Sequence, residues 1–163
     1  MAGTPSLADN LAALIGPEKV TTTPELLSAH SGDKWSASHP PDVVVFAEST
    51  ADVSAVLKFA NEHKIPVTTR GAGYGYVGGC VPLRGGIVIS LERMNRIKEI
   101  ALEDGVAVVE PDVPRAELAR LHSNDLSAAK GGDLGWLYQG DTVPEFEAAM
   151  DALKINQISQ PIQ

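Results

Sequence analysis

The most constraining feature of this sequence is a glycine-rich stretch between two short segments with strand-like composition. Residues 70–79 read Arg-Gly-Ala-Gly-Tyr-Gly-Tyr-Val-Gly-Gly, with five glycines in the nine positions after Arg70. Glycine permits positive φ and lets a ligand approach the bare backbone, so consecutive N–H groups can converge on an anion such as a diphosphate. The alternative is a flexible surface loop, but direct exit from a strand and the scarcity of Ser, Asp and Asn argue against it.

The same stretch matches the G-x-G-x-x-G fingerprint at Gly73, Gly75 and Gly78. In a Rossmann fold this fingerprint opens a helix, and a crossover between parallel strands needs about a dozen residues or more. Only residues 79–86 remain before the next strand pattern, and they include Pro82. We therefore predict no helix between the strands over 66–69 and 86–91, and we reject a Rossmann site.

The surrounding patterns predict a small α/β (α+β) unit with a mixed sheet. An amphipathic helix over 6–15 ends at Gly16-Pro17, and Thr23-Pro24 begins a short helix. Residues 43–46 are apolar throughout, as in a strand that is covered on both faces. We expect a crossover from this strand through one helix to a parallel strand at 66–69.

Two further elements complete this half of the chain. Ser49-Thr50-Ala51-Asp52 resembles a capping box, and the helix after it has a predicted apolar face of Val53, Val56, Leu57 and Ala60. Residues 97–102 and 106–109 flank a Glu-Asp-Gly turn, which predicts a hairpin.

Composition excludes several other functions. The 21 acidic residues outnumber the 13 basic ones, and a net charge of −8 disfavours nucleic acid and anionic membranes as partners. Cys80, the one cysteine, is expected to be a small buried residue, and the four histidines lack the paired spacing of a zinc site, so we predict no metal. No apolar run approaches the roughly 18 residues of a membrane span, so we expect a soluble, cytoplasmic protein.

A series of blocks across residues 41–111 carries a resemblance to a known family. The blocks are Pro41-Asp42-Val43-Val44, Ser49-Thr50-Ala51-Asp52-Val53, Ile65-Pro66-Val67, Arg70-Gly71-Ala72-Gly73, Gly78-Gly79, Gly85-Gly86-Ile87-Val88-Ile89-Ser90-Leu91, Arg93-Met94-Asn95 and Val109-Glu110-Pro111. Together, residues 17–113 resemble the PCMH-type FAD-binding module of FAD-linked oxidoreductases related to glycolate oxidase and D-lactate dehydrogenase.

The resemblance implies a cofactor site and a type of chemistry. In that family the loop wraps the FAD diphosphate with backbone amides, and the flavin accepts a hydride from a 2-hydroxy acid or related alcohol. The cofactor-binding residues expected here are Arg70, Gly71, Ala72, Gly73, Tyr74, Gly75, Gly78 and Gly79. Some family members join the flavin covalently to a histidine of this loop, whereas this loop has none, so we expect non-covalent FAD.

Two departures from the family limit what the resemblance implies. The family has Pro-Gly-Val where this chain has Pro111-Asp112-Val113, and a side chain removes backbone freedom there. The second half of the module and the substrate domain are not found in the sequence. We therefore assign no catalytic residue, and we expect that the chain does not form a complete flavin site alone.

Residues 117–163 resemble a different family, the parvulin-type peptidyl-prolyl isomerases of periplasmic chaperones. The resemblance is carried by Leu118-Ala119, His122-Ser123-Asn124-Asp125, residues 127–136 ending in Gly-Gly-Asp-Leu-Gly-Trp, Val143-Pro144-Glu145-Phe146-Glu147 and Ile158-Ser159-Gln160-Pro161. It implies a partial α+β segment in which Asp125 and Phe146 correspond to residues of the proline-binding site. The two histidines of that site have no counterpart, so we expect no isomerase activity.

Three hypotheses follow from these resemblances. The chain is an FAD-binding fragment of a flavoprotein, or a peptide-binding isomerase or chaperone fragment, or a chimera of the two with neither activity. The predicted boundary lies between residues 1–113 and 114–163. The expected partners are FAD, the remainder of a flavoprotein, or a peptide.

Overall fold

The computed structural model describes residues 4–101, 106–123, 127–131, 140 and 143–152. The chain divides into two compact units, Met1–Pro114 and Arg115–Gln163. No helix among these described residues is long and apolar enough to cross a membrane.

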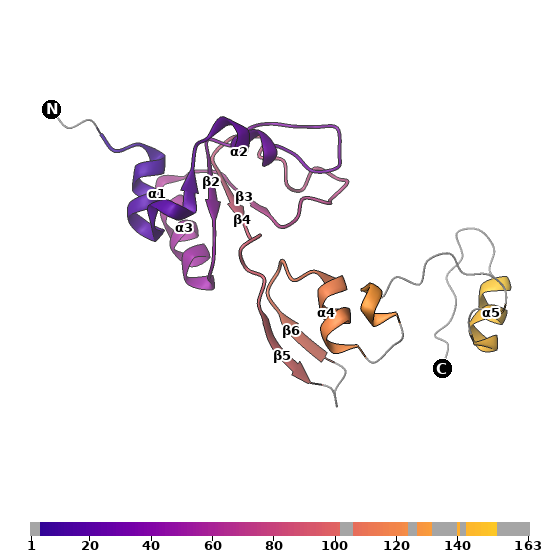
Figure 1. Ribbon diagram of the computed structural model, residues 1–163. Coiled ribbons are helices and arrows are strands. Elements are labelled where there is room, and N and C mark those ends of the chain that lie inside the picture. Colours follow the sequence, from indigo (N-terminus) through magenta and orange to yellow (C-terminus); the bar gives the residue numbers. More distant parts are fainter. Residues whose placement is uncertain (1–3, 102–105, 124–126, 132–139, 141–142, 153–163) are drawn as a thin grey trace. The chain divides into compact units, whose positions relative to one another are not determined.

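The first unit is built on a four-stranded mixed sheet (Figure 1). Its strands are β1 (Val20–Thr21), β2 (Val43–Phe46), β3 (Val67–Arg70) and β4 (Ile87–Ser90), in the order β1-β2-β4-β3. Strand β1 runs antiparallel to β2, and β4 runs parallel to both β2 and β3. The predicted mixed sheet is therefore confirmed. The two strands of the expected crossover are parallel, but β4 lies between them.

Helices cover both faces of this sheet. Alternate residues of β2 and β4 pack with Leu11 of α1 (Leu7–Ile15) and with Val56 and Ala60 of α3 (Thr50–His63). The other face packs against Leu27 of α2 (Pro24–Ala29). All four residues of β2 are buried, as the continuous apolar run predicted. On α3, however, Leu57 is 46% exposed, so its place on the predicted apolar face was wrong.

The helix starts use side-chain caps in different ways. Ser49 accepts a hydrogen bond from the Asp52 backbone N at 3.1 Å, as a capping box requires. The Asp52 carboxylate accepts from the Glu48 N at 3.0 Å and from the Lys19 Nζ at 3.1 Å, not from the Ser49 N. The predicted box is therefore only half formed, because Asp52 is used to join α3 to the segment before β1. Thr23 precedes α2 without a side-chain capping bond.

A separate two-stranded sheet follows β4. Strands β5 (Ile97–Ala101) and β6 (Val106–Val109) pair antiparallel, which confirms the predicted hairpin, although its turn lies outside the described residues. The base of the hairpin is joined by Glu110, whose carboxylate accepts from the Arg96 Nη2 at 2.8 Å and the Arg96 backbone N at 3.0 Å. These bonds connect the chain leaving β6 with the chain entering β5.

The second unit contains short helices. They are α4 (Arg115–His122), a 3-10 turn η2 (Ala128–Lys130) and α5 (Pro144–Asp151), which begins at the predicted Pro144. Gly131 ends η2 with a φ of +70°, and a Cβ there would lie 2.7 Å from the Ala116 Cβ. Helix α4 and η2 therefore pack closely together.

Candidate functional site

The glycine-rich stretch of residues 70–79, here called the glycine loop, begins at the carboxyl edge of the parallel strands. Phe46, Arg70 and Ser90 end β2, β3 and β4 in register. Ligands of open α/β sheets bind outside this edge. Residues 71–86, which connect β3 to β4, contain no helix, as predicted. The feature that ruled out a Rossmann crossover is therefore confirmed.

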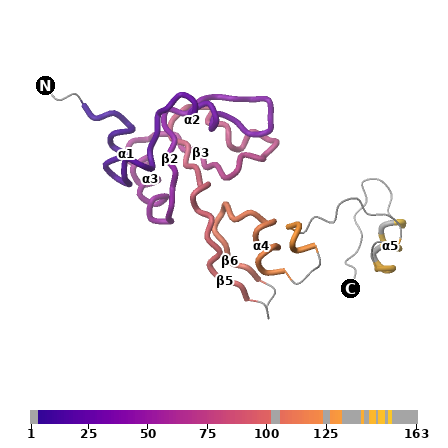
Figure 2. Tube along the Cα trace, viewed as in Figure 1, coloured from indigo at the N-terminus to yellow at the C-terminus, as the bar shows by residue number. Residues whose placement is uncertain are grey.

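A second loop forms the wall opposite the glycine loop, and sequence reasoning missed it. Residues 31–38, here called the serine segment, run beside the glycine loop (Figure 2). The Lys34 backbone N donates to the Gly75 carbonyl at 2.9 Å. The Ser31 and Ser38 hydroxyls hydrogen-bond to each other at 2.7 Å and close the segment on itself. The sequence shows mostly polar residues here, with no period that would indicate a partner.

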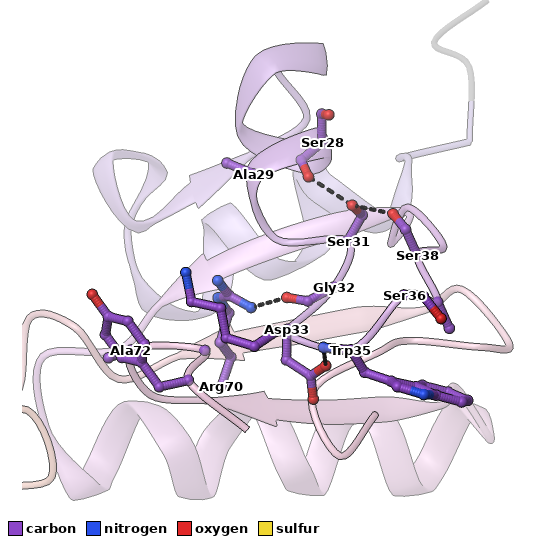
Figure 3. A pocket seen from close by; sticks show the side chains of 14 residues that line it. Ser28, Ala29, Ser31, Gly32, Asp33, Trp35, Ser36, Ser38, Arg70 and Ala72 are labelled. Carbon is purple, nitrogen blue, oxygen red and sulfur yellow. Dashed lines mark hydrogen bonds between the residues drawn. The ribbon is translucent and has the colours of Figure 1, made fainter. Parts of the chain in front are cut away.

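Arg70 contacts both the glycine loop and the serine segment. Its guanidinium donates to the Gly32 carbonyl (Figure 3). The same guanidinium occupies the space that a side chain on Gly73 would need, and Gly73 has a φ of +72°. Arg70 therefore holds the turn of the glycine loop from one side, and a side chain at Gly73 would be strained and would displace the guanidinium.

The two loops form the walls of an open cavity of about 340 Å³. It is lined by the end of α2, the serine segment, Arg70, Ala72, Gly73 and Tyr74. Four of the expected cofactor-binding residues thus share one wall. The other four, Gly71, Gly75, Gly78 and Gly79, do not line the cavity. Gly78 lies against Trp35 of the serine segment, and a Cβ on Gly79 would have no atom within 4 Å.

The backbone amides of the glycine loop have no acceptor within the described protein. From Gly71 to Cys80, no backbone N–H donates a hydrogen bond to any residue in the described part of the chain. Gly73 and Gly78 adopt positive φ, at 72° and 76°, a conformation that occurs in backbone turns whose N–H groups bind anions. A row of N–H groups without acceptors in a glycine-rich loop fits the phosphate oxygens of a dinucleotide.

Asp33 lies beneath the centre of the loop. Its Oδ1 accepts from the Trp35 N at 2.9 Å, whereas its Oδ2 is buried and has no hydrogen-bond partner among the described residues. A Cβ on Gly75 would lie 3.2 Å from that Oδ2. The serine segment therefore brings a negative charge close to the loop as well as the positive charge of Lys34.

A cluster of titratable groups lies near the end of β4, and it was not predicted either. The His30 Nε2 is 3.5 Å from the Glu92 carboxylate, which also accepts from the Ser90 hydroxyl at 3.1 Å. Burial and the nearby Glu92 charge raise the pKa of Asp112, the residue that stands where the resembled family has glycine. His30 and Glu92 are more than sixty positions apart in the sequence, so no motif indicated their proximity.

Some residues that the sequence analysis singled out differ from the prediction, and others lie outside the part of the chain that the structure describes. Cys80, expected to be buried, is only partly buried at the end of the glycine loop. Tyr74 and Tyr76 are 69% and 74% exposed. Asp125 lies outside the described residues, as does the side chain of Phe146 on α5.

A protein-family model described as an FAD binding domain matches residues 41–132, which is more than half of the chain. The chain belongs to this FAD-binding family. The predicted PCMH-type module and its cofactor FAD are thereby confirmed. A second family model, a PPIC-type PPIASE domain, matches residues 112–163 and confirms the parvulin-like resemblance. Residues 112–132 are matched by both families.

Similar proteins also fall into two groups. A D-lactate dehydrogenase from Anaerostipes hadrus is 39% identical over 108 residues, covering 65% of this chain and 23% of its own. The chaperone SurA from Dechloromonas aromatica is 75% identical over 48 residues, covering 29% of this chain and 11% of its own. The crystal structure of p-cresol methylhydroxylase with substrate bound aligns at 30% identity with a TM-score of 0.60, over 68% of this chain and 22% of its own. The chain thus spans less than a quarter of each.

Proposed function

We propose that residues 1–113 bind FAD non-covalently, with the diphosphate on the backbone amides of the glycine loop. The observation that carries this proposal is the row of amides from Gly71 to Cys80 without acceptors in the described chain. The contacts we expect are with the amides of Gly71, Ala72, Gly73, Tyr74 and Gly75, followed by those of Gly78 and Gly79. In this proposal Arg70 holds the loop through its contacts with Gly32 and Gly73 and does not contact the ligand.

The wider role we propose is that of a flavin-binding part of an oxidoreductase acting on a 2-hydroxy acid or related alcohol. The 39% identity to a D-lactate dehydrogenase supports this substrate class. The chemistry of hydride acceptance belongs to the flavin, and the protein contributes binding and orientation. We assign no catalytic residue, and the role of this chain is limited to holding the diphosphate.

A variant at Gly71 tests the diphosphate site. A Cβ on Gly71 would have no atom within 4 Å, and its φ is not positive, so Gly71→Val adds bulk without disturbing the loop. On the proposal that the phosphate rests on the Gly71 amide, the new side chain would hinder its approach, so FAD should bind at least about tenfold more weakly, a change of roughly 1.4 kcal/mol. Flavin fluorescence quenching measures the affinity, and an unchanged unfolding midpoint is the control. Equal binding by both proteins would remove the loop from the site.

The second candidate function is peptide binding by the parvulin-like residues 114–163. It is favoured by the 75% identity to the chaperone SurA over 48 residues. We propose that this part lacks isomerase activity, because its one histidine, His122, ends α4 and matches neither histidine of the resembled site. A chimera with neither activity is the remaining alternative, and it differs from the first proposal in predicting no FAD binding.

A further inference from the structure

We infer that Lys34 supplies the positive charge for the phosphate groups bound on the glycine loop. This inference rests on the proposed function and deepens it, because it assigns a cation to the phosphate groups in addition to the backbone amides of the loop. The ligand class is a diphosphate ester, whether in FAD, in ADP or as inorganic pyrophosphate. Neither the glycine-loop motif nor the family match, which begins at residue 41, includes Lys34.

The cavity has two cationic side chains, and they are not equivalent. Neither Lys34 nor Arg70 forms an ion pair with a carboxylate in the part of the chain that the structure describes. Arg70, however, is committed to the Gly32 carbonyl and fills the space under Gly73. It cannot turn toward a ligand without releasing the loop. Lys34 is therefore the cation that is free to move.

The main chain of Lys34 is fixed at the right place. Its N–H donates to the Gly75 carbonyl at 2.9 Å, so its Cα stays beside the middle of the amide row. Its side chain is exposed, and its Nζ lies over the Tyr74 ring, 5.0 Å from the centroid. Such a contact is weak at an exposed site, so an anion can draw the ammonium away from the ring. Lys34 is therefore fixed through its backbone, while its exposed side chain makes only this one ring contact among the described residues.

Asp33 gives a reason why a cation is needed. Its buried Oδ2 has no partner in the described chain and lies close to Gly75, so it opposes an anion bound at that point. The chain as a whole carries a net charge of −8, which adds to this repulsion. A charge-assisted contact from Lys34 offsets both, because attraction between unlike charges is strongest at contact distance.

The experiment compares Lys34→Gln with wild-type protein for binding of FAD, ADP and inorganic pyrophosphate by calorimetry. We expect all three ligands to bind about tenfold more weakly to the variant, and the salt dependence of binding to become shallower. Lys34→Arg should retain most of the affinity. Lys58→Gln on α3 is the matched control, since Lys58 is also an exposed lysine but does not line the cavity, and it should bind as wild type.

The outcomes separate this inference from the proposed function. If Lys34→Gln binds all ligands normally while Gly71→Val does not, the inference is wrong and the proposed function stands. If the variant weakens FAD but leaves ADP and pyrophosphate unchanged, Lys34 contacts another part of FAD and the inference is also overturned. If wild-type protein binds none of the three ligands, both proposals fail. An unchanged unfolding midpoint shows that any loss arises at the site and not from misfolding.

Discussion

At the scale of single residues, the glycines of one loop have different roles. Gly73 has positive φ and faces the Arg70 guanidinium, whereas Gly71 has open space around it. A sequence motif treats the two positions alike, because it shows only that glycine is present. The structure separates a glycine with positive φ beside the Arg70 guanidinium from one with open space around its Cβ position.

We predict that Gly73→Ala lowers stability while Gly71→Ala does not. A side chain at Gly73 must adopt a φ of +72° and displace Arg70 from the Gly32 carbonyl. The left-handed conformation alone costs roughly 1–3 kcal/mol for a residue other than glycine. Urea unfolding followed by circular dichroism measures the difference. Equal unfolding midpoints for the two variants would mean that Arg70 does not hold the loop in this way.

A second residue-scale prediction concerns pH. Hydrogen bonds from the Arg96 side chain and backbone lower the pKa of Glu110, whose side chain is 2% exposed. A carboxyl group with a lowered folded pKa stabilises the fold above its unfolded pKa of about 4.3. That contribution is lost as the pH falls through the folded pKa.

Thermal unfolding of Glu110→Gln between neutral and acidic pH tests whether the Glu110 carboxylate stabilises the fold at neutral pH and loses that effect in acid. At neutral pH the variant should melt at a lower temperature than wild type, and the gap should shrink as the pH falls below about 4. A gap of constant size at every pH would show that Glu110 contributes through packing and not through its charge. Glu99→Gln is a matched control, because Glu99 is an exposed glutamate on β5.

At the scale of elements, the two helix starts offer a direct comparison. Ser49 makes the capping bond to Asp52, and Thr23 precedes α2 without one. We predict that Ser49→Ala costs about 1 kcal/mol of stability and that Thr23→Ala costs clearly less. Chemical denaturation of the two variants measures both values. A larger loss for Thr23→Ala would contradict the assignment of the caps.

Local patterns predicted most of these elements but not their arrangement. The apolar run of β2, the positions at which α2 and α3 begin and the short gap before β4 depend on neighbouring residues, and these predictions are confirmed. The capping bonds at those helix starts are not all formed, because the Asp52 carboxylate bonds to Lys19 and Thr23 makes no capping bond. The position of β4 between β2 and β3 depends on pairing between β2 and β4 across more than forty residues. The exposure of Leu57 likewise depends on which side of α3 meets the sheet.

The candidate site was predictable only in part for the same reason. The glycine loop is evident from its composition, whereas the serine segment has no periodicity and no motif. Its contacts with the loop, from Lys34 to Gly75 and from Arg70 to Gly32, join residues 38 to 41 positions apart. Only the fold brings these residues together.

At the scale of the whole molecule, two families meet in one chain. The two compact units divide after Pro114, and both family models match residues 112–132. The predicted boundary between residues 113 and 114 stays a proposal, because both family models match helix α4. Limited proteolysis that yields a stable fragment ending near Pro114 would support it.

We predict that the chain does not accelerate prolyl isomerisation. An X–Pro bond has a barrier of roughly 20 kcal/mol, and lowering it requires polar groups fixed around the twisting amide. The parvulin-like residues offer Asp125 and Phe146 by resemblance but no histidine beyond His122. A protease-coupled assay at micromolar protein should give the uncatalysed rate. An acceleration that disappears in Asp125→Ala would replace the flavin proposal with the isomerase one.

The most direct test of the central claim is the visible absorption spectrum of the protein after incubation with FAD and removal of unbound cofactor. The proposal that the glycine loop holds FAD predicts two flavin bands at up to one FAD per chain, with the flavin released on denaturation because it is not covalently attached. The Gly71→Val variant should retain much less. A colourless wild-type protein, whose unfolding midpoint FAD does not raise, would contradict the account and favour the inactive chimera.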